Sequence, residues 1–206
     1  WIAPFNSRDI HIGVVISSHC VDGLDEPVSL AQRLDGVTMI YRLDAGALPT
    51  GREHFGFRDG IGGPHVIGST NQPRPGQDEV MPGEFIHGYE DELGNLSAGP
   101  TPCVLARNGT YLALRQLHTD VAAFRRYLRD NARSPEDEEL LAAKMVGRWR
   151  SGAPLALAPD HDDPELGADP QRNNDFRYYH DDLNGLRVPR GCHIRRANPR
   201  DSLQDS

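Results

Sequence analysis

The sequence predicts an α+β protein built from two units. Two short runs rich in β-branched residues, at 10–16 and 37–43, are typical of strands, and two amphipathic segments in the second half are typical of helices. Between them, Gly or Pro interrupts residues 45–99 every few positions, which excludes long regular elements there. Because strands and helices occur in separate runs, an α+β architecture is favoured. We place the units at 1–98 and 99–206.

The first unit is expected to contain two strands joined by a helix. Residues 10–16 predict a strand buried on at least one face, and residues 37–43 predict a second strand. Between them a short helix is expected over 28–34, with Gly36 as its C-terminal cap. The region after these elements is too long for an ordinary connection, and its aromatic and aliphatic anchors indicate an ordered functional loop.

The second unit is expected to contain a hairpin and two helices. Asn108-Gly109 is a tight-turn signal between the apolar runs 104–106 and 111–114, which predicts a β-hairpin. Thr119 is a suitable N-cap for a helix that runs to about residue 131. Ser134-Pro135, followed by acidic residues, is typical of the start of another helix.

Composition excludes several classes of partner. The 206 residues carry a net charge of -8 without a basic stripe, which argues against nucleic-acid and anionic-membrane partners. No apolar run is long enough to span a membrane. The cysteines Cys20, Cys103 and Cys192 are odd in number and widely spaced, so they favour a reducing, cytoplasmic compartment over a disulfide framework. A homo-oligomer is compatible with this composition. Because the chain begins at Trp1, we interpret it as a piece of a longer protein.

A glycine-rich loop at residues 54–64 carries one carboxylate, Asp59. Its glycines lack Cβ atoms, so the backbone can approach a flat ligand closely. The segment is equally compatible with a common Asp-Gly turn. It does not resemble a phosphate-binding loop, because the Lys-Ser/Thr ending is absent and no strand directly precedes the glycines.

A second motif, at residues 191–201, places the imidazole of His193 beside Arg195, Arg196 and Arg200. An imidazole can ligate a metal or a haem iron, and arginines can neutralise an anionic cofactor such as a propionate-bearing porphyrin. Taken alone, the motif also fits a basic surface turn with a solvated histidine.

Together these motifs resemble the dye-decolorising peroxidases. Residues 56–60, Gly-Phe-Arg-Asp-Gly, resemble the GxxDG signature of that family, and residues 193–200 resemble its haem-ligand segment. Residues 83–89, 107–112 and 146–149 are similar to further family segments and occur in the family's order. The resemblance covers most of the chain from about residue 10 onwards.

The resemblance implies a haem-dependent peroxidase with haem b as cofactor. It implies two ferredoxin-like units with antiparallel sheets, as in dimeric α+β barrels, both incomplete at the chain ends, with haem held mainly by the second. It makes His193 the proximal iron ligand and Asp59 the distal acid-base group. It also implies haem contacts from a set of six residues: Gly60, Ile61, Gly62, Asn198, Pro199 and Arg200.

The same resemblance implies the reaction and what this chain leaves out. Hydrogen peroxide is the expected oxidant, and dyes, phenols or other small aromatic one-electron donors are the expected reductants. A distal arginine and a carboxylate partner for the proximal imidazole are expected beyond residue 206. Because an unperturbed Asp carboxyl has a pKa of ~3.9, a distal aspartate predicts an acidic activity optimum.

Two other functions remain open from the sequence. A non-catalytic haem-binding or haem-delivery protein would need His193 but not Asp59. A binding module for a hard cation could use two clusters of acids beside histidines, at 161–163 and 180–182.

Overall fold

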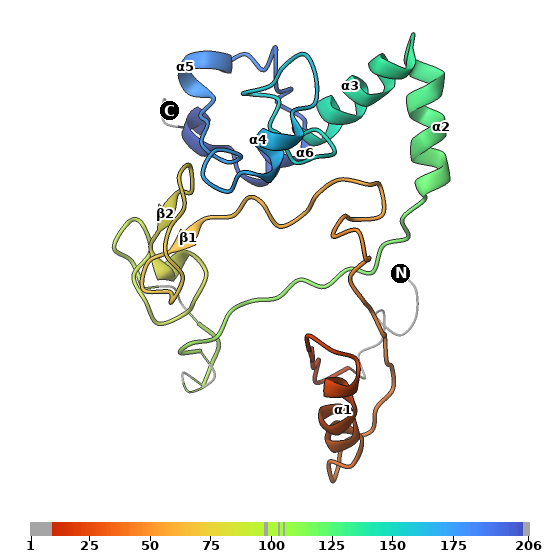
Figure 1. Ribbon diagram of the computed structural model, residues 1–206. Helices are drawn as coiled ribbons and strands as arrows, with labels where there is room; N and C mark the ends of the chain where they lie inside the picture. Colours follow the sequence, from red (N-terminus) through yellow and green to blue (C-terminus); the bar gives the residue numbers. More distant parts are fainter. Residues whose placement is uncertain (1–9, 97–98, 103, 105, 204–206) are drawn as a thin grey trace. The chain divides into compact units, whose positions relative to one another are not determined.

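The structure is a computed structural model that describes residues 10–96, 99–102, 104 and 106–203 (Figure 1). By contacts between residues the chain divides into two units, Trp1–Gly46 and Ala47–Ser206. This division separates two regions of dense contact and is not the predicted boundary between ferredoxin-like units. The boundary at residues 98 and 99, which concerns ferredoxin-like units, stays a prediction. Of the residues named above, Cys103 and Leu105 lie outside the described part of the chain.

The first unit contains a short helical segment, the 3-10 helix η1 (Asp22–Leu24) followed by α1 (Asp25–Gln32). The helix predicted at 28–34 therefore exists but begins earlier. Asp25 and Glu26 lie in its first turn, where carboxylates interact favourably with the helix dipole, and Pro27 is tolerated there. Gly36 has a left-handed φ of 74°, but α1 ends at Gln32, so Gly36 does not cap it.

The predicted strands at 10–16 and 37–43 are not formed, and this prediction was wrong. A strand is stable only when its backbone N–H and C=O groups pair with a neighbour. Neither run is part of a strand, and their side chains are largely exposed, with Val15 at 85%. The β-branched composition favours a strand, but composition does not supply the neighbouring strand that a sheet needs.

The second unit contains a sheet of two very short strands, β1 (His65–Val66) and β2 (Glu79–Val80). They pair in parallel, with His65 opposite Glu79, and η2 (Pro82–Glu84) follows. The predicted hairpin is reduced to its turn: Asn108 has a φ of 63° and Gly109 N–H donates to the Ala106 carbonyl. Residues 111–114, its second arm, form no strand.

The predicted pair of longer helices is confirmed. In α2 (Val121–Asn131) the N-cap is Asp120 and not Thr119 as predicted. The Asp120 carboxylate, one position later, accepts from Ala123 N–H at 2.7 Å. In α3 (Pro135–Val146) the N-cap is Ser134, as predicted, and the left-handed Gly147 ends the helix. Short helical segments follow: α4 (Pro164–Ala168), α5 (Tyr179–Asp182), α6 (His193–Ala197) and η4 (Arg200–Leu203).

The main core lies between residues 143 and 192. Its buried members are Ala143, Trp149, Ala153, Leu155, Leu166, Phe176, Tyr178, Val188 and Cys192. A smaller cluster joins Phe57 of the glycine-rich loop to Leu128 of α2 and Ala142 of α3. The Asp59 loop is therefore attached to the smaller cluster, and the His193 segment is attached to the main core through Cys192. Within the described residues, no helix has the length and apolarity needed to cross a membrane.

Candidate functional site

The residues before Asp59 fold into a tight turn that is held by the carboxylate of Glu53. Glu53 accepts hydrogen bonds from the backbone N–H groups of Phe55 and Phe57, at 2.8 Å each. Glu53 N–H in turn donates to the Phe57 carbonyl, and Gly56 adopts a left-handed φ of 97° at the turn. The sequence dictates this locally, because only glycine takes that conformation without strain.

The next residues form an exposed stretch, 58–60, between two buried side chains. Phe57 and Ile61 are buried, whereas Asp59 between them is exposed. The Arg150 guanidinium lies 4.9 Å from the centre of the Phe57 ring, and the Arg150 carbonyl accepts from Arg58 N–H. The loop is thus attached to the turn at residues 148–152 and presents the Asp59 carboxylate outward. One oxygen of that carboxylate accepts from Gly60 N–H at 2.7 Å.

His193 is the first residue of α6 and its side chain is exposed. The residues around it fix its position: Cys192 before it is buried in the core, and Arg195 after it is 4% exposed. An exposed imidazole between two buried anchors is available to a ligand from outside. This placement is compatible with the predicted role of His193 as an iron ligand, which stays a prediction.

Arg195 is not available to an anionic cofactor, contrary to the sequence interpretation of the arginine cluster. Its guanidinium pairs with the equally buried Asp182 carboxylate at 3.2 Å and donates to the Val188 carbonyl at 2.9 Å. It also lies 4.2 Å from the centre of the Tyr178 ring. Arg195 therefore stabilises the fold beneath α6, while Arg196 is exposed.

The segment after α6 is tied to the loop at residues 76–78. Asn198 donates to the Asp78 carboxylate at 3.4 Å, and its own side-chain oxygen accepts from Arg200 N–H. The Arg200 guanidinium donates to the Gly76 carbonyl at 2.8 Å and to the Asn174 side-chain oxygen at 2.6 Å. Pro199 between them is half-buried. Much of the hydrogen-bonding capacity of Arg200 is thus used within the protein.

Two buried residues that sequence reasoning missed, Arg148 and Asn174, connect the two motifs. The Asn174 side-chain oxygen accepts from Arg148 at 2.8 Å as well as from Arg200. Gly62 lies beside them: a Cβ placed on it would be 3.8 Å from that oxygen and 3.9 Å from the Arg148 guanidinium. Burial, together with the neighbouring Arg200, lowers the pKa of Arg148 to about 10. No local sequence signal distinguishes Asn174 from the other polar residues of its turn-rich segment.

The glycines of the loop leave room for a flat ligand. A Cβ placed on Gly60 or Gly63 would meet no atom within 4 Å, and Gly60 has a left-handed φ of 72°. This open backbone surface beside the Asp59 carboxylate fits the approach of a planar cofactor. The donor set also fits a haem iron, since His193 offers an exposed imidazole.

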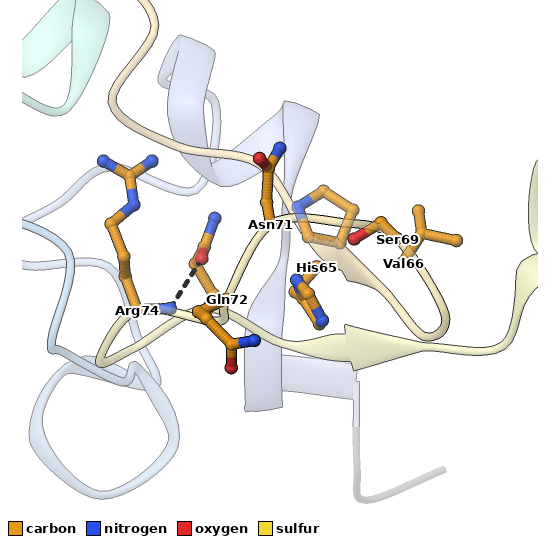
Figure 2. Close-up of a pocket in the computed structure, with 8 residues that line it drawn as sticks. His65, Val66, Ser69, Asn71, Gln72 and Arg74 are labelled. Atoms are coloured by element: carbon orange, nitrogen blue, oxygen red, sulfur yellow. Dashed lines mark hydrogen bonds between the residues drawn. The ribbon is translucent and has the colours of Figure 1, made fainter.

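A separate pocket lies within the loop that joins β1 to β2 (Figure 2). It has a volume of about 360 Å³ and contains neither Asp59 nor His193. Hydrogen bonds from Arg74 N–H to the Gln77 side chain, and from Gln77 to the Gly63 carbonyl, close the loop around it. This pocket is polar and local, and it is distinct from the surface around Gly60.

The acidic clusters proposed for a hard cation serve the fold. Asp162 accepts from the Ser151 hydroxyl, Asp163 caps α4 by accepting from Leu166 N–H, and Asp182 pairs with Arg195. The Asp181 side chain lies outside what the structure describes. Among the described residues, no group of three or more His, Cys, Asp or Glu side chains is arranged to hold a metal ion.

Comparison with known sequences gives matches to peroxidases over almost the whole of this chain. The chain is 40% identical over 210 residues to "Peroxidase 2" of Mycetinis scorodonius, covering 97% of this chain and 40% of that protein. It is 38% identical over 226 residues to a dye-decolorizing peroxidase of Mycena epipterygia, covering 100% of this chain and 42% of that protein. No family model matches the sequence. The chain thus spans about two fifths of the length of these curated relatives.

Comparison with solved structures agrees. A dye-decolorizing peroxidase from Auricularia auricula-judae matches with a TM-score of 0.78 and 39% identity, over 92% of this chain and 44% of that one. A dye-decolorizing peroxidase in complex with 2,6-dimethoxyphenol also matches with a TM-score of 0.78, over 90% of this chain and 44% of that one. An α+β fold of the ferredoxin-like kind follows from these neighbours. The sequence and structural matches together place this chain in the dye-decolorising peroxidase family.

Proposed function

We propose that the protein to which this chain belongs is a haem b peroxidase that uses hydrogen peroxide to oxidise dyes, phenols or other small one-electron donors. The observation that carries the proposal is the identity of 38–40% with peroxidases over 97–100% of the chain. That span includes both the Asp59 loop and the His193 segment. The proposal extends to the two ferredoxin-like units, 1–98 and 99–206, as the arrangement of the whole fold.

Each predicted residue has a definite task in this proposal. His193 would hold the haem iron through its imidazole, and the bare backbone at Gly60 and Gly62 would face the porphyrin. Haem, when bound, supplies the redox chemistry with peroxide. Asp59 would accept a proton from peroxide and return it to the departing oxygen. Its exposed position and its second oxygen, which accepts no hydrogen bond from the described residues, support this proton-transfer role.

A non-catalytic haem carrier is the alternative, and it differs in its need for Asp59. The test is peroxide-dependent oxidation of a phenol by the whole protein to which the chain belongs, after titration with hemin, in the wild type and in Asp59→Asn. We expect Asp59→Asn to bind hemin as the wild type does and to lose turnover by about 10²–10⁴-fold, the usual contribution of a positioned acid-base group. Equal turnover by the two proteins would exclude the role of Asp59. Hemin binding without peroxide turnover in either would favour the carrier.

A further inference from the structure

The buried Arg148 and the half-buried Arg200 share one neutral side-chain acceptor. Arg148 and Arg200 both donate to the side-chain oxygen of Asn174, at 2.8 and 2.6 Å, and Asn174 is only 3% exposed. Among the described residues, no carboxylate accepts a hydrogen bond from either guanidinium. The other acceptors of both guanidiniums are backbone carbonyls. A charge held away from water depends on its hydrogen bonds, so the shared side-chain oxygen contributes to the position of both guanidiniums.

Asn174 also joins segments that are far apart in the sequence. Its amide nitrogen donates to the Gly76 carbonyl at 3.3 Å, and its backbone carbonyl accepts from Arg200 at 3.2 Å. On the other side, its oxygen lies near Gly62 of the Asp59 loop, 3.8 Å from where a Cβ on that glycine would be. A second connection to that loop runs through the turn at 148–152: Arg148 donates to the Gly152 carbonyl, and a Cβ on Gly152 would be 2.5 Å from the Ile61 side chain.

The two contacts of Asn174 therefore lead to the two halves of the proposed haem site. Gly62 and Ile61 follow Asp59 by a few residues, and Arg200 follows His193 by one short helix. Displacement of the Asn174 side chain would remove one acceptor from Arg200 on one side and one from Arg148, which supports the Asp59 loop through Gly152, on the other. The same side chain thus constrains both segments at once.

We propose that Asn174 is a positioning residue that holds the Asp59 loop and the segment after His193 in a fixed relation to each other. The claim that this relation matters for haem binding rests on the proposed function. The positioning itself is a property of the protein without haem, and it is testable in that form.

The first experiment measures peptide-level hydrogen exchange of the haem-free chain. Asn174→Ala should raise exchange by about tenfold in both 58–62 and 198–201, since it removes a hydrogen bond from Arg200 on one side and one from Arg148, the link to the Asp59 loop, on the other. Asn173→Ala is the matched control. Asn173 is also 3% exposed, but its side chain donates only to the Gly167 carbonyl, at 3.0 Å.

The outcome that supports the proposal is a rise in both peptides for Asn174→Ala and in neither for Asn173→Ala. A rise confined to residues around 174, or the same pattern in both variants, would overturn it. If circular dichroism shows that Asn174→Ala is unfolded, Asn174→Ser takes its place, because its hydroxyl is too short to reach both guanidiniums and the same two peptides report the result.

The second experiment adds hemin and uses a conservative variant. Asn174→Asp keeps an oxygen for both arginines, so it should restore exchange protection and give a haem absorption band at the wild-type position. Asn174→Ala should bind hemin about tenfold more weakly, with a shifted band. A wild-type band in Asn174→Ala would overturn the link to haem. If the wild type itself takes up no hemin, the proposed function fails for this chain, while the exchange result still decides the positioning role.

Discussion

Residues 142–201 and residues 10–46 are stabilised to very different degrees. The first segment contains a buried aromatic core, a fully desolvated Arg195–Asp182 ion pair and the Asn174 network. The second contains one short helix, and none of its described residues is buried. Because apolar burial is the main favourable contribution to folding, the two segments should respond very differently to the same substitution. Regular secondary structure is therefore a poor guide to stability here, since the well-packed segment is mostly turns.

The largest expected effect is loss of the buried ion pair. Arg195→Ala leaves the Asp182 carboxylate buried without its counter-charge, which should lower the free energy of unfolding by about 3–5 kcal/mol. Denaturant unfolding of the purified chain measures this. Arg196→Ala, which removes an exposed arginine from the same helix, should change the free energy by less than about 0.5 kcal/mol. Comparable losses from both substitutions would contradict the structural role of Arg195.

The next effect compares one substitution in the two segments. Leu155 is fully buried and Leu30 in α1 is 59% exposed. Leu155→Ala should cost about 2–5 kcal/mol through lost burial and the cavity it leaves, whereas Leu30→Ala should be close to neutral. Thermal unfolding followed by circular dichroism separates the two. A large effect at Leu30 would show that residues 10–46 bury more than the structure describes.

A third effect concerns alkaline pH. Burial raises the pKa of Tyr178 to about 12, above its ordinary value of 10.0. Between these values the folded state holds a proton that the unfolded state has lost, so stability should fall by up to about 2 kcal/mol as the pH rises from 10 to 12. The lowered pKa of Arg148, about 10, acts in the opposite direction over that range, because there the unfolded state binds the extra proton.

The substitution Tyr178→Phe separates the two contributions to this pH dependence. It should remove the Tyr178 decline and make the stability of the variant rise, relative to wild type, between pH 10 and 12. Tyr127→Phe, which alters a half-exposed tyrosine of α2, should leave the wild-type profile unchanged. Parallel profiles for wild type and Tyr178→Phe would argue against a deeply buried phenol.

The smallest expected effect comes from a helix cap. Ser134 accepts from Asp137 N–H at the start of α3, whereas α1 has no side-chain hydrogen bond at its N-cap. Ser134→Ala should lower stability by about 1 kcal/mol, and Ser134→Gly by only a few tenths. Chemical denaturation of both variants tests this. Equal losses would mean that the hydroxyl does not act as a cap.

The sequence was informative where the determining interactions are local. The start of α3 follows from Ser134 and Pro135, and the Asp59 loop and His193 were found as short motifs. The strands at 10–16 and 37–43 were wrong, because pairing depends on a partner that composition does not reveal. Sequence reasoning could not predict the buried roles of Arg195, Arg148 and Asn174 for the same reason. Their partners lie many positions away, as with Arg195 and Asp182.

The most direct test of the central claim is the absorption spectrum of the chain after addition of one equivalent of hemin. We expect a Soret band of protein-bound, imidazole-ligated haem in the wild type and in Asp59→Asn. In His193→Ala this band should be lost and should return on addition of free imidazole, while His180→Ala, altering another histidine of the same unit, should keep it. A wild-type spectrum in His193→Ala would contradict the assignment of His193 as the iron ligand.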